Sequence, residues 1–276
     1  MKKSFFLALM FAGWLALPSC QKDKTKTIAD AEVNESVEMT TADDAFDEVE
    51  EIADQAWDQA LQTMKSTEDD RPRLGDCVTI TLDTISVPRV LTIDFGEVNC
   101  LCNDGKYRRG QIIVTFTGRY RRPGAVITHT FQNYYVNDNH VEGTKVMTNL
   151  GFNDSGYMIF HHEASGSITF VADGKVLNWT SDKTRSWIEG IGTPRWRDDV
   201  FLVEGTSTAS SSAGGSLTRL ITNQLRREMN CRWLVSGTIV TTQANRPERT
   251  LDFGDGSCDN LATLTIGDQT RTIILR

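Results

Sequence analysis

The sequence predicts an all-β protein with a single antiparallel β-domain, either a sandwich or an open half-barrel meander, preceded by one amphipathic α-helix. Three observations predict this fold class. An apolar stripe with helical spacing occurs once, before residue 66. After residue 77, apolar and polar residues alternate in short runs, and the runs are separated by turn signals such as Asn-Asp-Gly and Pro-Gly.

Residues 1–19 are predicted to be a secretion signal. Lys2 and Lys3 are followed by a mostly apolar run over residues 5–17, which is too short to span a bilayer comfortably. An exported protein is therefore expected, in a compartment where thiols oxidise.

The signal ends in Leu17-Pro18-Ser19-Cys20, which resembles the lipobox of bacterial lipoproteins. This resemblance implies that Cys20 carries lipid chains, which bind a membrane with roughly 0.8 kcal/mol for each buried methylene. Residues 20–41 then form the lipid anchor and a polar tether. Gln21, rather than an Asp, after the cysteine points to the outer membrane. Residues 20–24 match a surface-directing signal only in part, because Lys24 stands where a second acid would be expected, so a periplasmic and a surface-exposed orientation both stay open.

Charge is distributed unevenly along the chain. The net charge is -8, which argues against a nucleic-acid partner, because phosphate binding depends on an excess of Lys and Arg. Residues 21–70 carry 16 acidic and 4 basic side chains, whereas residues 71–276 carry 21 acidic and 23 basic ones. An acidic arm therefore precedes a nearly neutral domain.

The acidic arm contains the predicted helix, over residues 42–66. Its apolar stripe consists of Phe46, Val49, Ile52, Ala53, Ala56, Trp57, Ala60, Leu61 and Met64. Thr41 is expected to cap the helix, and the acids that follow favour its positive end. We expect the stripe to dock on the β-domain; a partner-binding or self-plugging helix is the alternative. A helix on the membrane surface is disfavoured, because its polar face is acidic.

The β-domain is predicted over residues 71–276. Strand patterns lie near residues 78–83, 112–120, 125–136, 157–163, 167–172, 175–180, 200–207, 232–242, 261–266 and 270–276. The segment 205–216, rich in Ser, Thr, Gly and Ala, is predicted to be a flexible loop.

A degenerate internal repeat links the two ends of this domain. In both, a cysteine is followed by a strand pair and then by Asp-Phe-Gly and a second cysteine. The repeat predicts disulfides between Cys77 and Cys100 and between Cys231 and Cys258, with Cys102 free. A bridge from Cys77 to Cys102 is the nearest alternative.

The same stretches carry a resemblance to a family. LTIDFG (91–96), RRGQIIVTFTGRYRRPG (108–124), CRWLVSG (231–237) and TLDFGDGSCDN (250–260) resemble segments of an uncharacterised family of outer-membrane lipoproteins common in Bacteroidota. The resemblance covers most of residues 77–276. It implies envelope placement and a β-rich domain, and it implies no particular activity.

Catalytic signals are weak, and we expect no cofactor and no metal. Neighbouring His161 and His162 point to opposite faces of a strand and are a poor ligand pair. The Asp-Phe-Gly segments are expected to be strand-ending turns, and the oxygen-rich segment 255–260 a tight loop rather than a calcium site. Four tryptophans are expected to lie in the core rather than to form sugar platforms: Trp179, Trp187, Trp196 and Trp233.

A patch for an anionic ligand is predicted from five arginines that flank one strand: Arg108, Arg109, Arg119, Arg121 and Arg122. A glycan, a lipid headgroup, a protein partner or the acidic arm itself fits such a patch. The function expected is that of a lipid-anchored outer-membrane lipoprotein with a non-catalytic binding or structural β-domain. The alternative is an envelope hydrolase that uses carboxylates, with these acids as candidates: Glu163, Glu189, Asp198 and Asp199.

Overall fold

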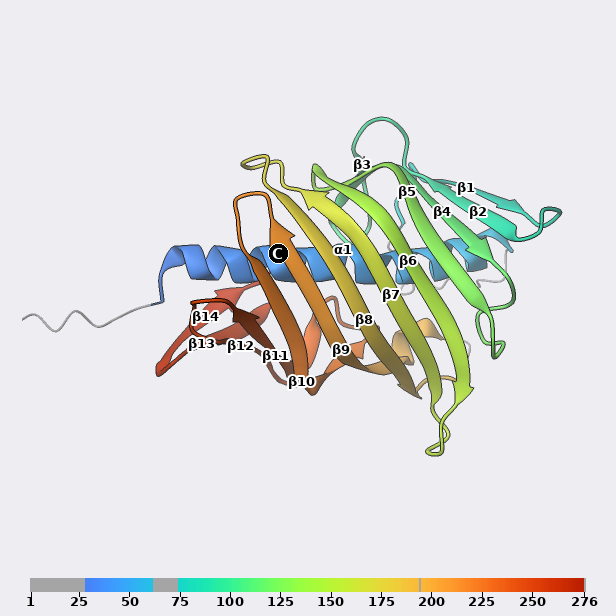
Figure 1. Cartoon of the computed structure of the whole chain (residues 1–276). Helices are drawn as coiled ribbons and strands as arrows, with labels where there is room; N and C mark the ends of the chain where they lie inside the picture. The colour runs from blue at the N-terminus through green and yellow to red at the C-terminus, as the bar shows by residue number, and fades with distance from the viewer. Residues whose placement is uncertain (1–27, 62–73, 194, 276) are drawn as a thin grey trace, which may run out of the picture.

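The computed structural model describes residues 28–61, 74–193 and 195–275. The predicted signal peptide and Cys20 lie outside the described residues. The described chain forms one long helix and a single 14-stranded antiparallel sheet that curves around it (Figure 1). The predicted all-β class with one preceding helix is confirmed, in the form of an open meander rather than a sandwich.

The strands follow one another across the sheet in chain order, with β3 alone off the path and paired with β4. Their bounds are β1 Thr79–Asp83, β2 Arg89–Asp94, β3 Cys100–Leu101, β4 Tyr107–Phe116, β5 Val126–Val136, β6 Asn139–Phe152, β7 Met158–Thr169, β8 Val176–Glu189, β9 Val200–Ser211, β10 Ser216–Glu228, β11 Leu234–Gln243, β12 Arg249–Asp255, β13 Leu261–Ile266 and β14 Gln269–Ile274. A short 3-10 turn, η2, covers Trp196–Asp198.

Alternation along the strands determines which side chains face the helix. In β8, Leu177, Trp179 and Trp187 point inward and are buried, while Asn178 and Thr180 point outward. This period of two gives the sheet one apolar and one polar face. Trp179 and Trp187 are core residues as predicted, and Trp196 and Trp233 are partly buried against the core.

Helix α1 spans Asp30–Ala60 and lies against the inner face of the sheet, crossing behind the strands in Figure 1. It begins twelve residues before the predicted start, because Val33 and Val37 extend the apolar stripe onto the cluster formed by β10 to β14. Thr41 is therefore no cap; its hydroxyl donates to the carbonyl of Val37, 2.9 Å away. The helix ends at Ala60, and residues 62–66 of the predicted helix lie outside the described residues.

The second half of α1 packs most tightly. Phe46 has no exposed surface and stacks on Trp179 with 4.8 Å between ring centroids. The close approach depends on Gly166 in β7, where an added Cβ would lie 2.7 Å from the Phe46 ring. The predicted docking of the stripe on the β-domain is confirmed.

The predicted loop over residues 205–216 is wrong. Strand β9 continues to Ser211 and β10 begins at Ser216, so only the turn between them is irregular. Ser207 and Ala209 point inward and are buried, whereas the residues between them point outward. The composition favours a loop, but small side chains are what fit beneath a close-packed helix.

The internal repeat corresponds to two matched hairpins, β1–β2 and β11–β12. In each, an aspartate of the second strand accepts a hydrogen bond from the glycine amide two residues on, at 2.8 Å for both Asp94 and Asp252. Gly96 and Gly254 have φ values of +82° and +98°, which favour glycine, and the phenylalanine before each is buried. The first Asp-Phe-Gly segment ends β2 as predicted, whereas the second lies inside β12, where the pairing with β11 shifts register.

The disulfides are those that the repeat predicts. Cys77 is bonded to Cys100, and Cys231 to Cys258, with Cα–Cα distances of 5.9 and 5.7 Å. Cys102 is a buried free thiol.

Candidate functional site

The inner face of the sheet, which we call the trough, is basic, and the helix that lies in it is acidic. The trough is defined by buried or partly buried cations from β4, β6, β8, β10, β12 and the turn before β4: Lys106, Arg108, Lys145, Lys183, Arg185, Arg219, Arg227 and Arg249. Nine carboxylates of α1 pair with bases of the β-domain: Asp30, Glu32, Glu35, Glu38, Asp43, Asp47, Glu48, Glu50 and Glu51. The arm and the domain thus neutralise each other inside the fold.

At the helix N-terminus the pairs are partly exposed. Glu35 lies 2.6 Å from both Arg246 and Arg249, and Asp30 lies 2.6 Å from Arg271. Pairs of this kind contribute at most about 1 kcal/mol each.

Toward the middle of the helix the pairs become buried. Lys183 bridges Asp43 and Asp47 at 3.1 and 2.9 Å, and Arg219 also pairs with Asp43. The pKa of Lys183 is raised: burial opposes the charge, but the two carboxylates outweigh it. Asp43, Lys183 and Arg219 are buried, and loss of one partner of a buried pair costs far more than loss of an exposed one.

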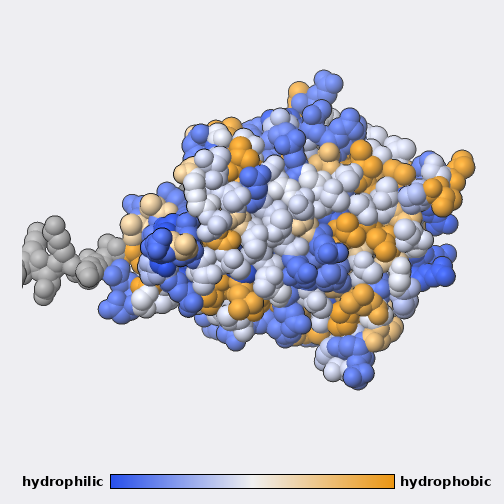
Figure 2. Space-filling view, in the orientation of Figure 1, coloured by the Kyte–Doolittle hydropathy of each residue, from blue (hydrophilic) through white to orange (hydrophobic). Residues whose placement is uncertain are grey.

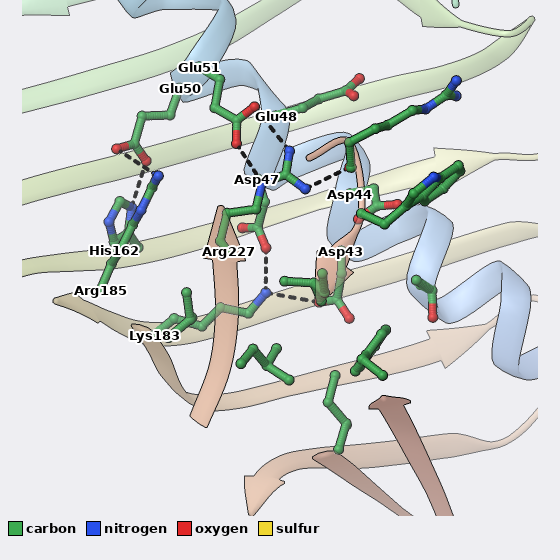
Figure 3. Close-up of a pocket in the computed structure, with 18 of the residues that line it drawn as sticks. Asp43, Asp44, Asp47, Glu48, Glu50, Glu51, His162, Lys183, Arg185 and Arg227 are labelled. Atoms are coloured by element: carbon green, nitrogen blue, oxygen red, sulfur yellow. Dashed lines mark hydrogen bonds and ion pairs between the residues drawn. The ribbon is translucent and has the colours of Figure 1, made fainter. Parts of the chain in front are cut away.

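Glu50 is the most enclosed of these carboxylates (Figure 3). Tyr120 donates to it at 2.9 Å, and Arg185, His162 and Lys145 lie 3.2, 3.3 and 3.4 Å away. Burial would raise the pKa of Glu50, but His162, Arg185 and Lys145 outweigh it and hold the pKa well below its usual range. Three strands, β6, β7 and β8, and the loop between β4 and β5 therefore converge on one ionised carboxylate of the helix.

Two buried histidines border this cluster. Burial, with Lys145 nearby, lowers the pKa of His129 to about 4 and that of His162 to about 3. Both imidazoles are therefore neutral at pH 7.

A cavity of about 80 Å³ remains between α1 and the wall formed by β9 to β12. Its lining combines the charged side chains of Figure 3 with apolar ones, among them Leu225, Trp233 and Phe253. Half-buried Asp44 lines it, and burial raises the pKa of Asp44 to about 6. A volume of about 80 Å³ is far below the roughly 300–1,000 Å³ of ordinary small-molecule sites.

The five predicted patch arginines do not form one surface. Arg108 points into the trough and pairs with Glu48 and Asp104, whereas Arg109 points outward and pairs with Asp138. Their opposite directions follow from strand alternation in β4. Arg119, Arg121 and Arg122 lie beyond the other end of β4, in the exposed loop before β5. The five arginines therefore do not form one patch, and Arg108 contacts the acidic arm, which was one of the partners considered; binding of an anionic ligand stays a prediction.

Of the candidate hydrolytic acids, Glu163 lies apart, whereas the fold places Glu189 beside the Asp198–Asp199 segment, because Glu189 pairs in register with Val200. Glu163 lies on the outer face opposite Asp182, and Glu189 pairs with Arg226. Asp199 differs from them, because burial and the adjacent Asp198 raise its pKa to about 7. Asp198 itself accepts a hydrogen bond from Thr193 at 2.8 Å.

The two adjacent histidines diverge as strand alternation requires. His161 faces outward to Asp182 at 3.0 Å, and His162 faces the trough.

In the 255–260 loop, Asp255 accepts from Ser257 and Asp259 accepts from the amide of Leu261, as a tight loop predicts. Within the part of the chain that the structure describes, no three His, Cys, Asp or Glu side chains are grouped as metal ligands.

Sequence reasoning missed the basic lining of the trough. A signal for it exists in β8, where Lys183 and Arg185 occupy the same alternating positions as Trp179 and Trp187. Cations at inward positions of an otherwise apolar strand indicate buried counter-charges. The acidic arm was the obvious source of such charges.

Among the described residues, no helix combines the length and the apolarity needed to cross a bilayer. Comparisons of the chain with family models, with curated proteins and with solved structures find no match.

Proposed function

We propose that this protein is a lipid-anchored outer-membrane lipoprotein with a non-catalytic binding or structural β-domain, of the Bacteroidota family that its motifs resemble. Its acidic helix serves as a permanent inner layer of that domain. The lipid on Cys20 holds the domain at the membrane.

The proposal of a non-catalytic domain rests on the ion pairing of the carboxylates and on the little space beside them. Most acids of α1 that face the trough are held in ion pairs; Asp44 is not among these pairs, and only about 80 Å³ of space remains beside it. A catalytic pair needs an open position for substrate and water. The geometry therefore favours a filled, rigid body that acts through its outer surface.

The length of the tether supports the anchoring part of the proposal. Helix α1 begins ten residues after Cys20. A chain of that length spans at most about 35 Å when fully extended. A lipid on Cys20 would hold the folded domain within that distance of the bilayer.

Metabolic labelling with palmitate, followed by membrane fractionation, tests the anchor. We expect the label on the wild-type protein in the membrane fraction, and Cys20→Ala should lose both the label and the membrane association. Cys102→Ala is the matched control, because it removes a cysteine of the folded domain and should keep the label. Recovery of wild-type protein as soluble and unlabelled would refute the proposal.

One observation favours the alternative of an envelope hydrolase that uses carboxylates. Asp199, with its pKa raised to about 7, is protonated in a large fraction of molecules at neutral pH, as a general acid must be. A panel of envelope glycans tested for release of reducing ends would detect such an activity. Only activity that Asp199→Asn abolishes in a folded protein would support this alternative.

A further inference from the structure

Two connections between neighbouring strands, at the same end of those strands, carry exposed apolar and basic side chains. The β4–β5 loop, residues 117–125, contains Arg119 and Arg122, and the β6–β7 hairpin contains Leu150, Phe152 and Tyr157. Figure 1 shows both loops at the lower right edge of the sheet, where the hairpin reaches beyond the body of the molecule. We call this region the tip.

Backbone contacts hold the two loops side by side. The amide of Gly124 donates to the carbonyl of Asn149 at 2.7 Å, and the amide of Asn149 donates to Ala125 at 2.9 Å. The side chain of Asn149 also donates to the carbonyl of Tyr120, at 2.8 Å. The tip is therefore a braced surface, built on the ends of β4 to β7.

Three large apolar side chains of the tip are exposed to solvent. Leu150, Phe152 and Tyr157 are 59%, 61% and 39% exposed. Figure 2 shows apolar surface beside hydrophilic surface at this lower edge. Exposed aromatic and aliphatic groups clustered at a loop end are typical of surfaces that meet a partner or a membrane.

The arginines of the tip differ from those of the trough. Arg108, Arg185, Arg219, Arg227 and Arg249 all pair with carboxylates. Among the described residues, no carboxylate pairs with Arg119 or Arg122, and both are exposed. Arg121 between them donates to the carbonyl of Ile191, and its guanidinium lies over the Trp187 ring. The loop 117–125 and residues 150–157 of the hairpin together contain three arginines and one acid, Asp154, so these two segments carry an excess of positive charge.

We propose that the tip docks on the surface of an anionic lipid bilayer, with Leu150, Phe152 and Tyr157 in the interface and Arg119 and Arg122 on lipid phosphates. Aromatic and apolar side chains favour the headgroup region, and each arginine near an anionic surface adds attraction that salt weakens. The inference rests on the proposed lipid anchor, which brings a bilayer within reach. It adds that the domain has a fixed contact with the membrane rather than hanging free on its tether.

Sedimentation of the mature chain with vesicles tests docking apart from lipidation when Cys20 is replaced by Ser. Vesicles of phosphatidylcholine are compared with vesicles in which part of it is replaced by phosphatidylglycerol. We expect binding to the anionic vesicles that weakens as salt is added. Arg119→Gln with Arg122→Gln should lower the partition coefficient about thirtyfold, from roughly fivefold for each arginine. Leu150→Ser with Phe152→Ser should lower it at least about tenfold.

Matched controls come from another exposed hairpin. Ile85→Ser with Val87→Ser removes two apolar side chains that are even more exposed, between β1 and β2, and Arg89→Gln removes an exposed arginine. These variants should bind like the parent, and thermal unfolding should show that all variants remain folded. Failure of the parent to bind anionic vesicles, or tip variants that bind as well as it does, would overturn the docking proposal. Palmitate labelling would be unaffected by that result, so the proposed anchor is judged separately.

Discussion

Glu50 shows that a single carboxylate of α1 can be both buried and ionised in the inner layer of the fold. It is ionised while buried, because Lys145, Arg185, His162 and Tyr120 surround it. A buried ion pair adds little over a well-packed apolar pair, yet loss of one partner strands the other charge. The individual acids of α1 are therefore far from equivalent, although they look alike in the sequence.

Glu50→Gln should destabilise the fold by about 3–5 kcal/mol at pH 7, because it leaves Lys145 and Arg185 buried with one fewer counter-charge. Glu38→Gln is the matched control on the same helix. Glu38 pairs with Lys175 in a partly exposed position, so its loss should cost less than about 1 kcal/mol. Urea unfolding of both variants measures the difference. Equal effects would mean that Glu50 is not buried among cations.

Asp199 makes the fold less stable as the pH rises, which is the opposite of the effect of a carboxylate whose pKa is lowered, such as Glu50. Its pKa is raised from 3.8 to about 7, so its contribution to stability is full below pH 4 and is lost as the pH rises through 7. Asp199→Asn keeps the group neutral and should stabilise the protein at pH 8 by about 1–2 kcal/mol, a value reduced for a half-exposed group. Near pH 4 the two proteins should have similar stability. A variant that is no more stable than wild type at pH 8 would show that Asp199 ionises normally.

At the scale of elements, sequence patterns predict the secondary structure of each segment better than they predict its tertiary contacts. The apolar stripe predicts the helix and the alternation predicts the strands, since both reflect local geometry. The start of α1 is missed because Val33 and Val37 continue the stripe across polar residues of the expected tether. The pairing of Asp43 with Lys183 joins residues 140 apart, and no local pattern specifies it.

The two disulfide hairpins are the element for which the sequence was most informative, because the repeat matched both cysteine pairs. Each bridge closes a loop with a sequence separation of 23 or 27 residues, which predicts roughly 3–4 kcal/mol from loop closure. Cys231→Ser with Cys258→Ser should lower the unfolding free energy by about 2–4 kcal/mol. Cys102→Ala breaks no bridge and should cost less. Peptide mapping that finds Cys77 joined to Cys102 would contradict the first pairing.

For the whole molecule, the helix and the sheet make one folded unit. A sheet with a basic and apolar inner face would expose both without α1, and α1 alone could bury neither its stripe nor its charges. Contacts such as Glu35 with Arg249 join the two ends of the chain, so the inner layer is complete only after the last strands have formed. The sequence predicts the components of this unit, but not that the acidic arm would fill the trough. That outcome depends on side chains that meet only in the curved sheet.

Hydrogen exchange on the isolated mature protein tests this central claim most directly. If α1 is the inner layer of the domain, the amides of residues 46–56 open only when the whole protein unfolds, and they should exchange as slowly as those of β7 and β8. Deletion of residues 42–60 should then destabilise the sheet itself. Amides of α1 that exchange rapidly while β7 and β8 stay protected would show that the helix leaves the trough, and would contradict the account.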